Sequence, residues 1–316
     1  MSVNLVNYVE SVRETLKPPV SNKILFDGDQ IKVMVVGGPN QRKDFHVERG
    51  EELFYMLVGD MDLDIMENGE LKRIPIKEGD FFLLPSCVPH SPQRYANTIG
   101  IVFERERFPD EMDCLRWYVP EESSTSSGGD EVLYEEMFHC TDLGTQIKAV
   151  IERFNESKSS GFAKLPDKVD LSMEKYFQRP DQLSSADFFK FTLNEKVELL
   201  SSRILDDGKL PKPDTPINSE FRVDLISNTL PIALNCEIGG EVFLWQQSGV
   251  SEIYESELQS TSHLPATREA TKLLRTGEVV LLKRRLLSNS TPILISQMES
   301  GGVVLCVSNS SILPQN

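Results

Sequence analysis

A chain of 316 residues with a formal net charge of -16 has room for about two domains and lacks the surplus of basic residues that nucleic acids and anionic membrane surfaces select. We therefore expect no nucleic-acid partner and no membrane association. Five scattered cysteines without a Cys-x-x-Cys pair argue against a disulfide framework or a zinc–thiolate site, and favour reduced thiols in the cytosol.

The first expected element is a helix from Asn4 to Leu16, because apolar residues recur there at helical spacing and Pro18-Pro19 follow. This segment carries acidic residues and lacks the apolar centre of a signal peptide. No apolar run approaches the roughly 20 residues that span a bilayer. A strand from Ile31 to Val36 is expected next.

Residues 39 to 107 are typical of short strands joined by tight turns. Glu51–Val58, Met61–Met66 and Gly79–Leu84 are the expected strands, since each is a short run of apolar and β-favouring residues bounded by glycine. Asn68-Gly69 predicts a two-residue hairpin, because both residues accept the positive φ of a type I′ turn. So many short antiparallel strands predict a small barrel or sandwich.

Two histidines and one glutamate in this stretch form a candidate metal site. His46 and Glu52 are an even number of residues apart, so a single strand would point both into a barrel, unless a turn at Arg49-Gly50 resets the alternation. Together with His90 they would form the two-imidazole, one-carboxylate triad that suits non-heme Fe(II), and Zn or Mn would also fit. The alternative is that both histidines are ordinary polar residues of a β domain.

The rest of the chain continues with a helix, a linker and a second set of strands. A helix is expected over Val132–Phe154, interrupted at Gly144, with His139 structural. A polar linker at residues 158–182 separates a catalytic domain, residues 1–157, from a second domain, residues 183–316. Ser185–Leu205 has helical character, and strands are expected from Ser219 onward. His263 is expected in a surface loop.

The second set of strands is similar to the first, without its candidate ligands. Aligning GEELFYMLVG (residues 50–59) with GEVFLWQQSG (residues 240–249) places Val242 at the position of Glu52. The same alignment places Cys236 at the position of His46. With longer loops in the second half, GEVVLLK (residues 277–283) overlays GDFFLLP (residues 79–85) and places Ser288 at the position of His90. GVVLC, which starts at Gly302, overlays GIVFE, which starts at Gly100, and places Cys306 at the position of Glu104. We therefore predict a mainly β fold of two β-barrels with a few peripheral helices, in which only the first barrel binds a metal and the second only packs and stabilises.

The candidate site resembles the two sequence motifs of the cupin superfamily. The matching residues are His46, Glu52 and Gly59 for the first motif and Gly79, Pro85 and His90 for the second. The chain departs from the motifs at Asp44, where a first histidine is usual, and at Cys87, where glycine is usual. The resemblance implies two cupin-type barrels, a bicupin, with three protein ligands in the first.

Four longer strings resemble one family more closely, that of the 3-hydroxyanthranilate 3,4-dioxygenases. They are GGPNQRKDFH, GEELFYMLVGDM, FLLPSCVPHSPQR and VFERER, and the similarity is dense from Pro18 to Tyr118. The chain lacks the Cys-rich second metal site of bacterial members. It resembles the animal-type form, in which a degenerate second cupin is fused to the first.

This resemblance implies a role for each matching residue. His46, Glu52 and His90 would hold Fe(II), with Glu52 also next to the substrate. Arg42 and Arg94 would bind the substrate carboxylate, which a guanidinium can contact through two hydrogen bonds. Asn22 would lie near the pocket mouth. Glu104 would contact the amino or hydroxyl group, either as a base with a raised pKa or as the partner of an arginine.

The implied reaction opens the ring of 3-hydroxyanthranilate with O2 to give 2-amino-3-carboxymuconate semialdehyde, a kynurenine-pathway step towards quinolinate and NAD. We expect a monomer in the cytosol. A metal-dependent cupin isomerase is a second reading, which oxygen uptake would distinguish. A non-enzymatic bicupin that binds or stores a small molecule is a third, and it predicts no bound metal.

Overall fold

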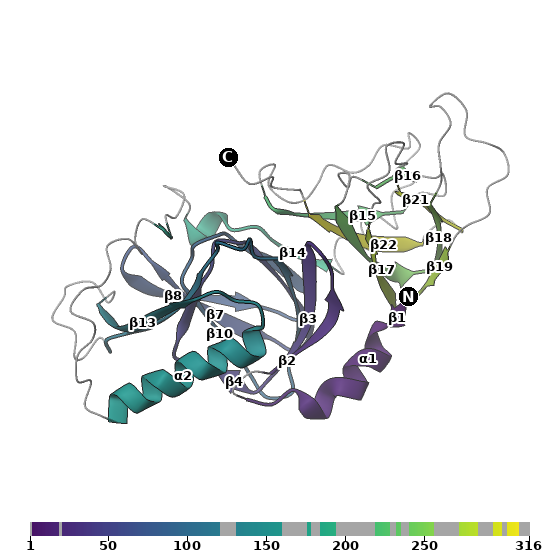
Figure 1. The fold of residues 1–316 in the computed structure, drawn as a ribbon. Helices are drawn as coiled ribbons and strands as arrows, with labels where there is room; N and C mark the ends of the chain where they lie inside the picture. Colours follow the sequence, from purple (N-terminus) through teal and green to yellow (C-terminus); the bar gives the residue numbers. More distant parts are fainter. Residues whose placement is uncertain are drawn as a thin grey trace. The chain divides into compact units, whose positions relative to one another are not determined.

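The computed structural model describes residues 2–18, 21–120, 131–159, 176–177, 184–193, 219–227, 232–234, 240–255, 272–283, 293–298 and 302–309. These residues are mainly β, with the strands and helices placed as Figure 1 shows. The strands are β1 (Val3–Asn4), β2 (Asn22–Asp27), β3 (Ile31–Gly37), β4 (Asn40–Gln41), β5 (Phe45–Val47), β6 (Glu52–Val58), β7 (Met61–Glu67), β8 (Glu70–Ile76), β9 (Asp80–Leu84), β10 (His90–Arg94), β11 (Ile99–Arg105), β12 (Asp113–Tyr118), β13 (Val132–Phe138), β14 (Lys190–Thr192), β15 (Phe221–Ile226), β16 (Ile232–Ala233), β17 (Glu241–Ser248), β18 (Val250–Glu255), β19 (Lys272–Arg275), β20 (Glu278–Lys283), β21 (Ile293–Gln297) and β22 (Val303–Asn309). The helices are α1 (Leu5–Val12) and α2 (Leu143–Ser159), with 3-10 turns at Arg13–Thr15 and Ser185–Asp187.

The chain divides into two compact units. The first barrel comprises Arg13–Leu25 and Val33–Phe191, and the second barrel comprises Met1–Val12, Phe26–Lys32 and Thr192–Asn316. Most of the expected linker, residues 160–175 and 178–183, lies outside the described residues. The domain boundaries expected at residues 157 and 183 stay a prediction.

Two sheets enclose the core of the first barrel. Among the described residues, one sheet has the order β13-β12-β5-β10-β7-β8, with β4 beside β10, and the other has the order β14-β9-β6-β11-β3-β2. One buried apolar cluster draws side chains from both sheets, including Met34, Phe54, Leu63, Ile65 and Phe82. Side chains that alternate inward along each strand therefore meet between the sheets.

The strands of the first barrel agree closely with those expected from the sequence. The expected β6, β7 and β9 begin or end within one residue of the observed bounds. Asn68 and Gly69 have φ values of 53° and 80°, and they join β7 to β8 so that Glu67 pairs with Glu70. The predicted hairpin is confirmed, and positive φ at both residues is what a type I′ turn requires.

The helix expected over Val132–Phe154 is wrong in its first half. Val132–Phe138 forms the strand β13, which pairs along the length of β12, and α2 begins only at Leu143. The run of apolar residues before Gly144 is too short to distinguish a helix from a strand by its periodicity. Backbone hydrogen bonds with the neighbouring strand β12 favour the strand. Trp117 on β12 stacks on Phe154 of α2 at 4.1 Å between ring centroids, which fixes the helix against the sheet.

Two further expectations meet different outcomes. The helical character expected at Ser185–Leu205 is wrong for its first part, since the 3-10 turn at Ser185–Asp187 is followed by strand β14, which pairs with β9. Leu193, the last described residue of this range, is helical. Residues 194–205 lie outside the described residues, as does His263. His139 follows β13, and its Nδ1 lies 2.7 Å from the Glu111 carbonyl, in keeping with a structural role.

The second barrel repeats the strand order of the first. Its sheets have the orders β1-β20-β17-β22-β15 and β16-β21-β18-β19, so that β20, β17, β22 and β15 correspond to β9, β6, β11 and β3. Val242 faces Leu282 as Glu52 faces Leu84. The internal repeat predicted from the sequence therefore has a counterpart in the topology of the described strands.

The register corrects one position of the predicted repeat. Glu104 pairs with Glu52 across β11 and β6, whereas Ser308 pairs with Val242 across β22 and β17. Ser308, not Cys306, therefore occupies the place of Glu104. The alignment was two residues off because it matched Gly302 with Gly100. Cys236 and Ser288 lie outside the described residues.

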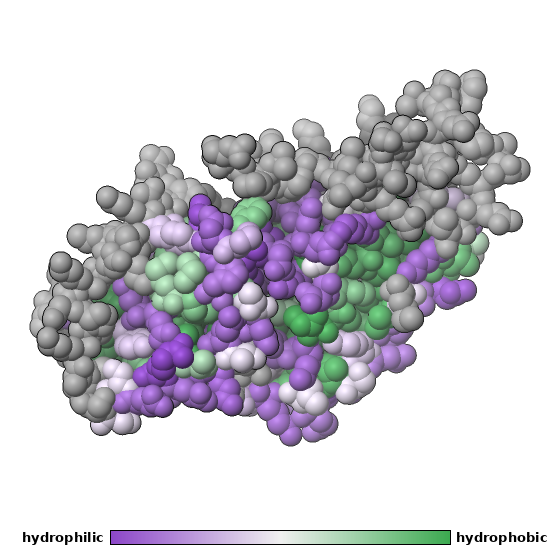
Figure 2. All heavy atoms as spheres, viewed as in Figure 1, coloured by the Kyte–Doolittle hydropathy of each residue, from purple (hydrophilic) through white to green (hydrophobic). Residues whose placement is uncertain are grey.

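One face of the described residues is largely polar. Figure 2 shows hydrophilic side chains over much of the described part of one face, with hydrophobic ones in smaller groups between them. None of the helices that the structure describes has both the length and the apolar character needed to cross a membrane.

Candidate active site

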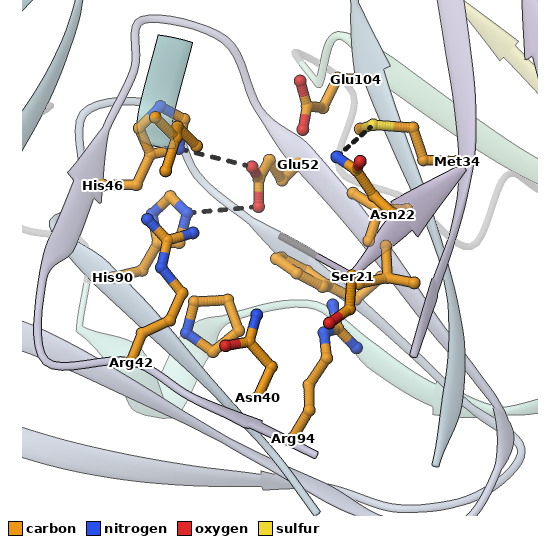
Figure 3. A pocket seen from close by; sticks show the side chains of 15 residues that line it. Ser21, Asn22, Met34, Asn40, Arg42, His46, Glu52, His90, Arg94 and Glu104 are labelled. Carbon is orange, nitrogen blue, oxygen red and sulfur yellow. Dashed lines mark hydrogen bonds and ion pairs between the residues drawn. The ribbon is translucent and has the colours of Figure 1, made fainter. Parts of the chain in front are cut away.

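Three candidate ligands converge between the two sheets of the first barrel. His46 on β5 and His90 on β10 are paired neighbours in one sheet, and Glu52 begins β6 in the other. The Glu52 carboxylate lies 3.9 Å from His46 Nδ1 and 3.3 Å from His90 Nε2 (Figure 3). The three residues thus offer two ring nitrogens and one carboxylate oxygen that all lie within 4.8 Å of one another.

The structure brings these residues together by a route that differs from the predicted one. His46 and Glu52 do not share a strand, because the turn at residues 48–51 sends the chain from one sheet to the other. The parity argument is therefore wrong, although the convergence it predicted is confirmed. The backbone N–H of Cys87, which has φ of 61°, donates to the Glu48 carbonyl and ties the turn before His90 to the segment after His46.

Each imidazole is oriented by a hydrogen bond on the side away from Glu52. His90 Nδ1 lies 2.9 Å from the Val88 carbonyl, which accepts its N–H and leaves the Nε2 lone pair facing Glu52. His46 Nε2 lies 2.9 Å from the Asp113 carboxylate, so its Nδ1 lone pair faces Glu52. Carbonyl and carboxylate partners of this kind are what fix metal-binding histidines in other proteins.

The donor set suits a divalent transition-metal ion. Burial lowers the pKa of His46, with Asp113 opposing the effect, and so favours the neutral imidazole that binds metals. The pKa of Glu52 is lowered in spite of its burial, because His90 next to it favours the carboxylate. Two imidazoles and one carboxylate on one side of a pocket leave room for further ligands opposite. The residues present therefore fit the expected metal.

A buried arginine that the sequence did not point out organises the carboxylates behind the triad. Arg107 contacts the Glu104 carboxylate, lies 2.7 Å from Glu48 and lies 3.0 Å from Asp113. It therefore links the expected catalytic glutamate to the partner of His46. Glu104 and Asp113 lie three and six positions from Arg107 along the chain, whereas Glu48 lies 59 positions away (107 − 48). No sequence spacing therefore marks the whole cluster.

Glu104 has a feature of each of the two roles that the sequence left open. It is ion-paired with Arg107, yet its pKa is raised to about 7. Burial is the main cause, Arg107 opposes it, and the nearby charge of Glu52 adds to it. A carboxyl group with a pKa near neutrality can exchange a proton at physiological pH.

A pocket of about 580 Å³, counted with the open solvent at its mouth, contains every expected site residue. Its lining residues are Ser21, Asn22, Met34, Val36, Asn40, Arg42, His46, Glu52, Phe54, His90, Pro92, Arg94, Val102, Glu104 and Ile147. Asn22, expected near the pocket mouth, is among them, and its Nδ2 lies 3.7 Å from Met34 Sδ.

The two arginines of the pocket differ in their surroundings. Arg42 is held by Asp44, whose carboxylate accepts from Arg42 Nε at 2.9 Å, so the residue in place of the usual first histidine orients an arginine instead. Arg94 is 3% exposed, and its Nη1 lies 3.2 Å from Met61 Sδ, with no carboxylate within ion-pair distance among the described residues. Burial lowers its pKa to about 10. A buried guanidinium without a carboxylate is costly and indicates a binding site for an anion.

The fold and the site together define a class, that of two-barrel cupin-type proteins with a candidate metal site in the first barrel. Comparison with known proteins gives the family. The family model described as 3-hydroxyanthranilic acid dioxygenase matches residues 1–155. The 3-hydroxyanthranilate 3,4-dioxygenase of Xenopus laevis is 37% identical over 308 residues, which cover 98% of this chain and 97% of that protein. The chain belongs to the 3-hydroxyanthranilate 3,4-dioxygenase family, as the sequence motifs predicted.

Two further comparisons cover different shares of the chain and differ in sequence identity. The human 3-hydroxyanthranilate 3,4-dioxygenase is 47% identical over 165 residues, which cover 51% of this chain and 54% of that protein. Among solved structures, a "Cupin 2 conserved barrel domain protein" from Leptotrichia buccalis covers 98% of this chain and 96% of its own at 9% identity, with a TM-score of 0.47. That likeness is too distant to bear on function.

Proposed function

We propose that this chain opens the ring of 3-hydroxyanthranilate with O2 and yields 2-amino-3-carboxymuconate semialdehyde. Membership of the family over nearly the whole chain supports this activity. The observation that carries the proposal is the meeting of the His46–Glu52–His90 triad with a buried, carboxylate-free Arg94 in one pocket. The pocket thus offers a place for a metal and a place for the carboxylate of an aromatic acid.

The metal of the proposal is Fe(II), held by His46 Nδ1, His90 Nε2 and a Glu52 oxygen. Bound there, it would supply the one-electron chemistry that lets O2 react with the aromatic ring. The chain's own contribution is orientation. Asp113 and the Val88 carbonyl hold the two imidazoles with their lone pairs toward Glu52.

Arg94 and Arg42 would bind the substrate carboxylate. A guanidinium can donate two parallel hydrogen bonds to a carboxylate, and the low exposure of Arg94 strengthens that contact by excluding water. Asp44 keeps Arg42 in position. Glu52, which lies on the pocket wall between the histidines and Glu104 in Figure 3, would contact the substrate as well as the metal.

Glu104 would remove the proton from the phenolic hydroxyl group. Its carboxylate accepts that proton, its raised pKa suits the task near neutral pH, and Arg107 holds it against the pocket. The ring would then be cleaved beside the carbon that carries the hydroxyl group, with both oxygen atoms of O2 entering the product.

Oxygen consumption tests the proposal against its alternatives. The protein is loaded with Fe(II) under anaerobic conditions and mixed with 3-hydroxyanthranilate and O2. We expect uptake of one O2 per substrate and a new semialdehyde absorbance. Conversion without oxygen uptake would favour an isomerase, and binding without conversion would favour a storage protein.

We also propose that the chain acts as a monomer in the cytosol, and that its product cyclises to quinolinate on the way to NAD. The scattered cysteines and acidic composition support the compartment. Light scattering of the purified protein tests the oligomeric state, and a mass of two chains would contradict it.

A further inference from the structure

One wall of the pocket carries a buried hydroxyl group that has no partner. Ser21 is 1% exposed, it lines the pocket, and its Oγ has no hydrogen-bond partner among the described residues. A buried hydroxyl group without a hydrogen bond destabilises the folded protein, and native structures contain few of them. Such a group in a pocket wall is explained if a ligand completes its hydrogen bond.

The backbone holds Ser21 firmly in this wall. The Ser21 carbonyl accepts a hydrogen bond of 2.8 Å from the Gly37 N–H at the end of β3, and β2 begins at the next residue. The hydroxyl group is therefore presented by two neighbouring strands, and its orientation depends on little beyond its own rotamer.

Ser21 and Arg94 line the same pocket. In the view of Figure 3 the two side chains are drawn next to each other and apart from His46 and His90. Both groups are buried, both can donate hydrogen bonds, and neither has a carboxylate or carbonyl partner among the described residues. Two unmatched donors in one pocket call for an acceptor with several lone pairs, and a carboxylate has about four.

We propose that Ser21 is a substrate-binding residue, whose hydroxyl group donates a hydrogen bond to the substrate carboxylate beside Arg94. The inference rests on the proposed role of Arg94 and extends it. The Arg94 guanidinium attracts the anion through its charge, and the Ser21 hydroxyl group fixes the orientation of the carboxylate. Ser21 thereby contributes to the selection of an aminophenol with a carboxylate over one without.

Binding of two ligands to the Fe(II)-loaded enzyme tests the inference. Dissociation constants for 3-hydroxyanthranilate and for 2-aminophenol, which lacks the carboxylate, are measured by calorimetry without oxygen. We expect Ser21→Ala to weaken 3-hydroxyanthranilate about tenfold, because a hydrogen bond to a charged group is lost. Binding of 2-aminophenol should change less than about twofold. Ser21→Cys, similar in size but a weak donor, should behave like Ser21→Ala.

The thermal stability of the ligand-free protein provides a second readout. Ser21→Ala removes an unpartnered buried group, so the melting temperature should stay the same or rise. The matched control is Ser251→Ala in the second barrel, where the buried Ser251 hydroxyl group donates to Gln246 Oε1. This variant should melt at a lower temperature and bind both ligands as the unaltered protein does.

The outcomes separate this inference from the proposed site. Equal losses for both ligands in Ser21→Ala, or no loss for either, would overturn the role of Ser21. Arg94→Gln is measured in parallel and should weaken only the ligand that carries a carboxylate. If Arg94→Gln shows no such preference, the proposed carboxylate site itself fails.

Discussion

Buried acidic residues outnumber the cations around the candidate metal site. Glu48, Glu52, Glu104 and Asp113 are all less than a tenth exposed, and Arg107 is the cation that contacts three of them. Burial and mutual repulsion raise the pKa values of Glu48 and Glu104. A divalent cation at the triad would offset this excess of negative charge, which is a physical reason to expect a metal there.

The pH dependence of catalysis follows from Glu104. A base must be unprotonated, and burial raises its pKa to about 7, so its active fraction falls about tenfold for each pH unit well below that value. A bound divalent cation lowers the pKa, and we expect kcat/KM to rise with pH to a plateau whose midpoint lies at or below pH 7.

Glu104→Gln is the matched variant for this profile. It keeps the shape of the side chain, removes the base, and should lower kcat by about 10²–10⁴-fold while removing that midpoint. A variant that retains both its rate and the same pH midpoint would show that another group is the base.

Asp113 should matter for metal affinity, although it is not a ligand in the proposed site. It accepts from His46 Nε2 at 2.9 Å, and Asp113→Asn leaves a neutral, weaker acceptor in the same place. We expect the dissociation constant for Fe(II) to rise about 10–100-fold. Calorimetric titration under anaerobic conditions measures this, and unchanged affinity would mean that His46 needs no such partner.

The candidate ligands could be predicted from the sequence, but the residues that support them could not. His46 and His90 are two of only four histidines in the chain, and each stands in one of the family's motif strings. Asp113 is 67 residues from His46, and acids of its kind are frequent in this sequence. Ser21 becomes notable only through burial without a partner, which depends on the three-dimensional structure.

At the scale of single elements, β11 shows how a strand can make room for a charged side chain. Gly100 on β11 faces Arg94, and an added Cβ there would lie 2.8 Å from Arg94 Nη1 and 3.3 Å from the Tyr55 carbonyl. The glycine therefore belongs to the proposed anion site, although it has no polar side chain of its own.

Gly100→Ala should displace the Arg94 guanidinium and raise KM for 3-hydroxyanthranilate about tenfold or more, because the carboxylate contact depends on its position. Steady-state kinetics measure this effect. Gly69→Ala is the control, since φ of 80° at the β7–β8 turn makes alanine costly by about 1–2 kcal/mol without touching the pocket. Equal KM values in the two variants would contradict the role of Gly100.

Element types were predictable where local chemistry decides them. Asn68-Gly69 specifies its own turn, so the β7–β8 hairpin follows from two residues. β13 depends instead on pairing with β12, a partner separated from it along the chain by residues 119–131. Helix α2 forms where apolar residues at helical spacing can pack on Trp117.

At the scale of the whole molecule, the two barrels share a topology but not an interior. The second barrel fills its core with apolar side chains, including Val242 at the place of Glu52, and Ile293 and Ile295 on the strand that corresponds to β10. No group of three potential metal ligands is found among its described residues. The repeat was visible in the sequence through glycine spacing, but its register needed the backbone pairing.

The central claim is that His46, Glu52 and His90 hold one metal ion per chain. Anaerobic titration of Fe(II) into the unaltered protein and into Glu52→Ala, with circular dichroism to confirm folding, tests this claim most directly. The account predicts one site per chain in the former and none in the folded variant. Full occupancy of Glu52→Ala, or a second equivalent site in the unaltered protein, would contradict it.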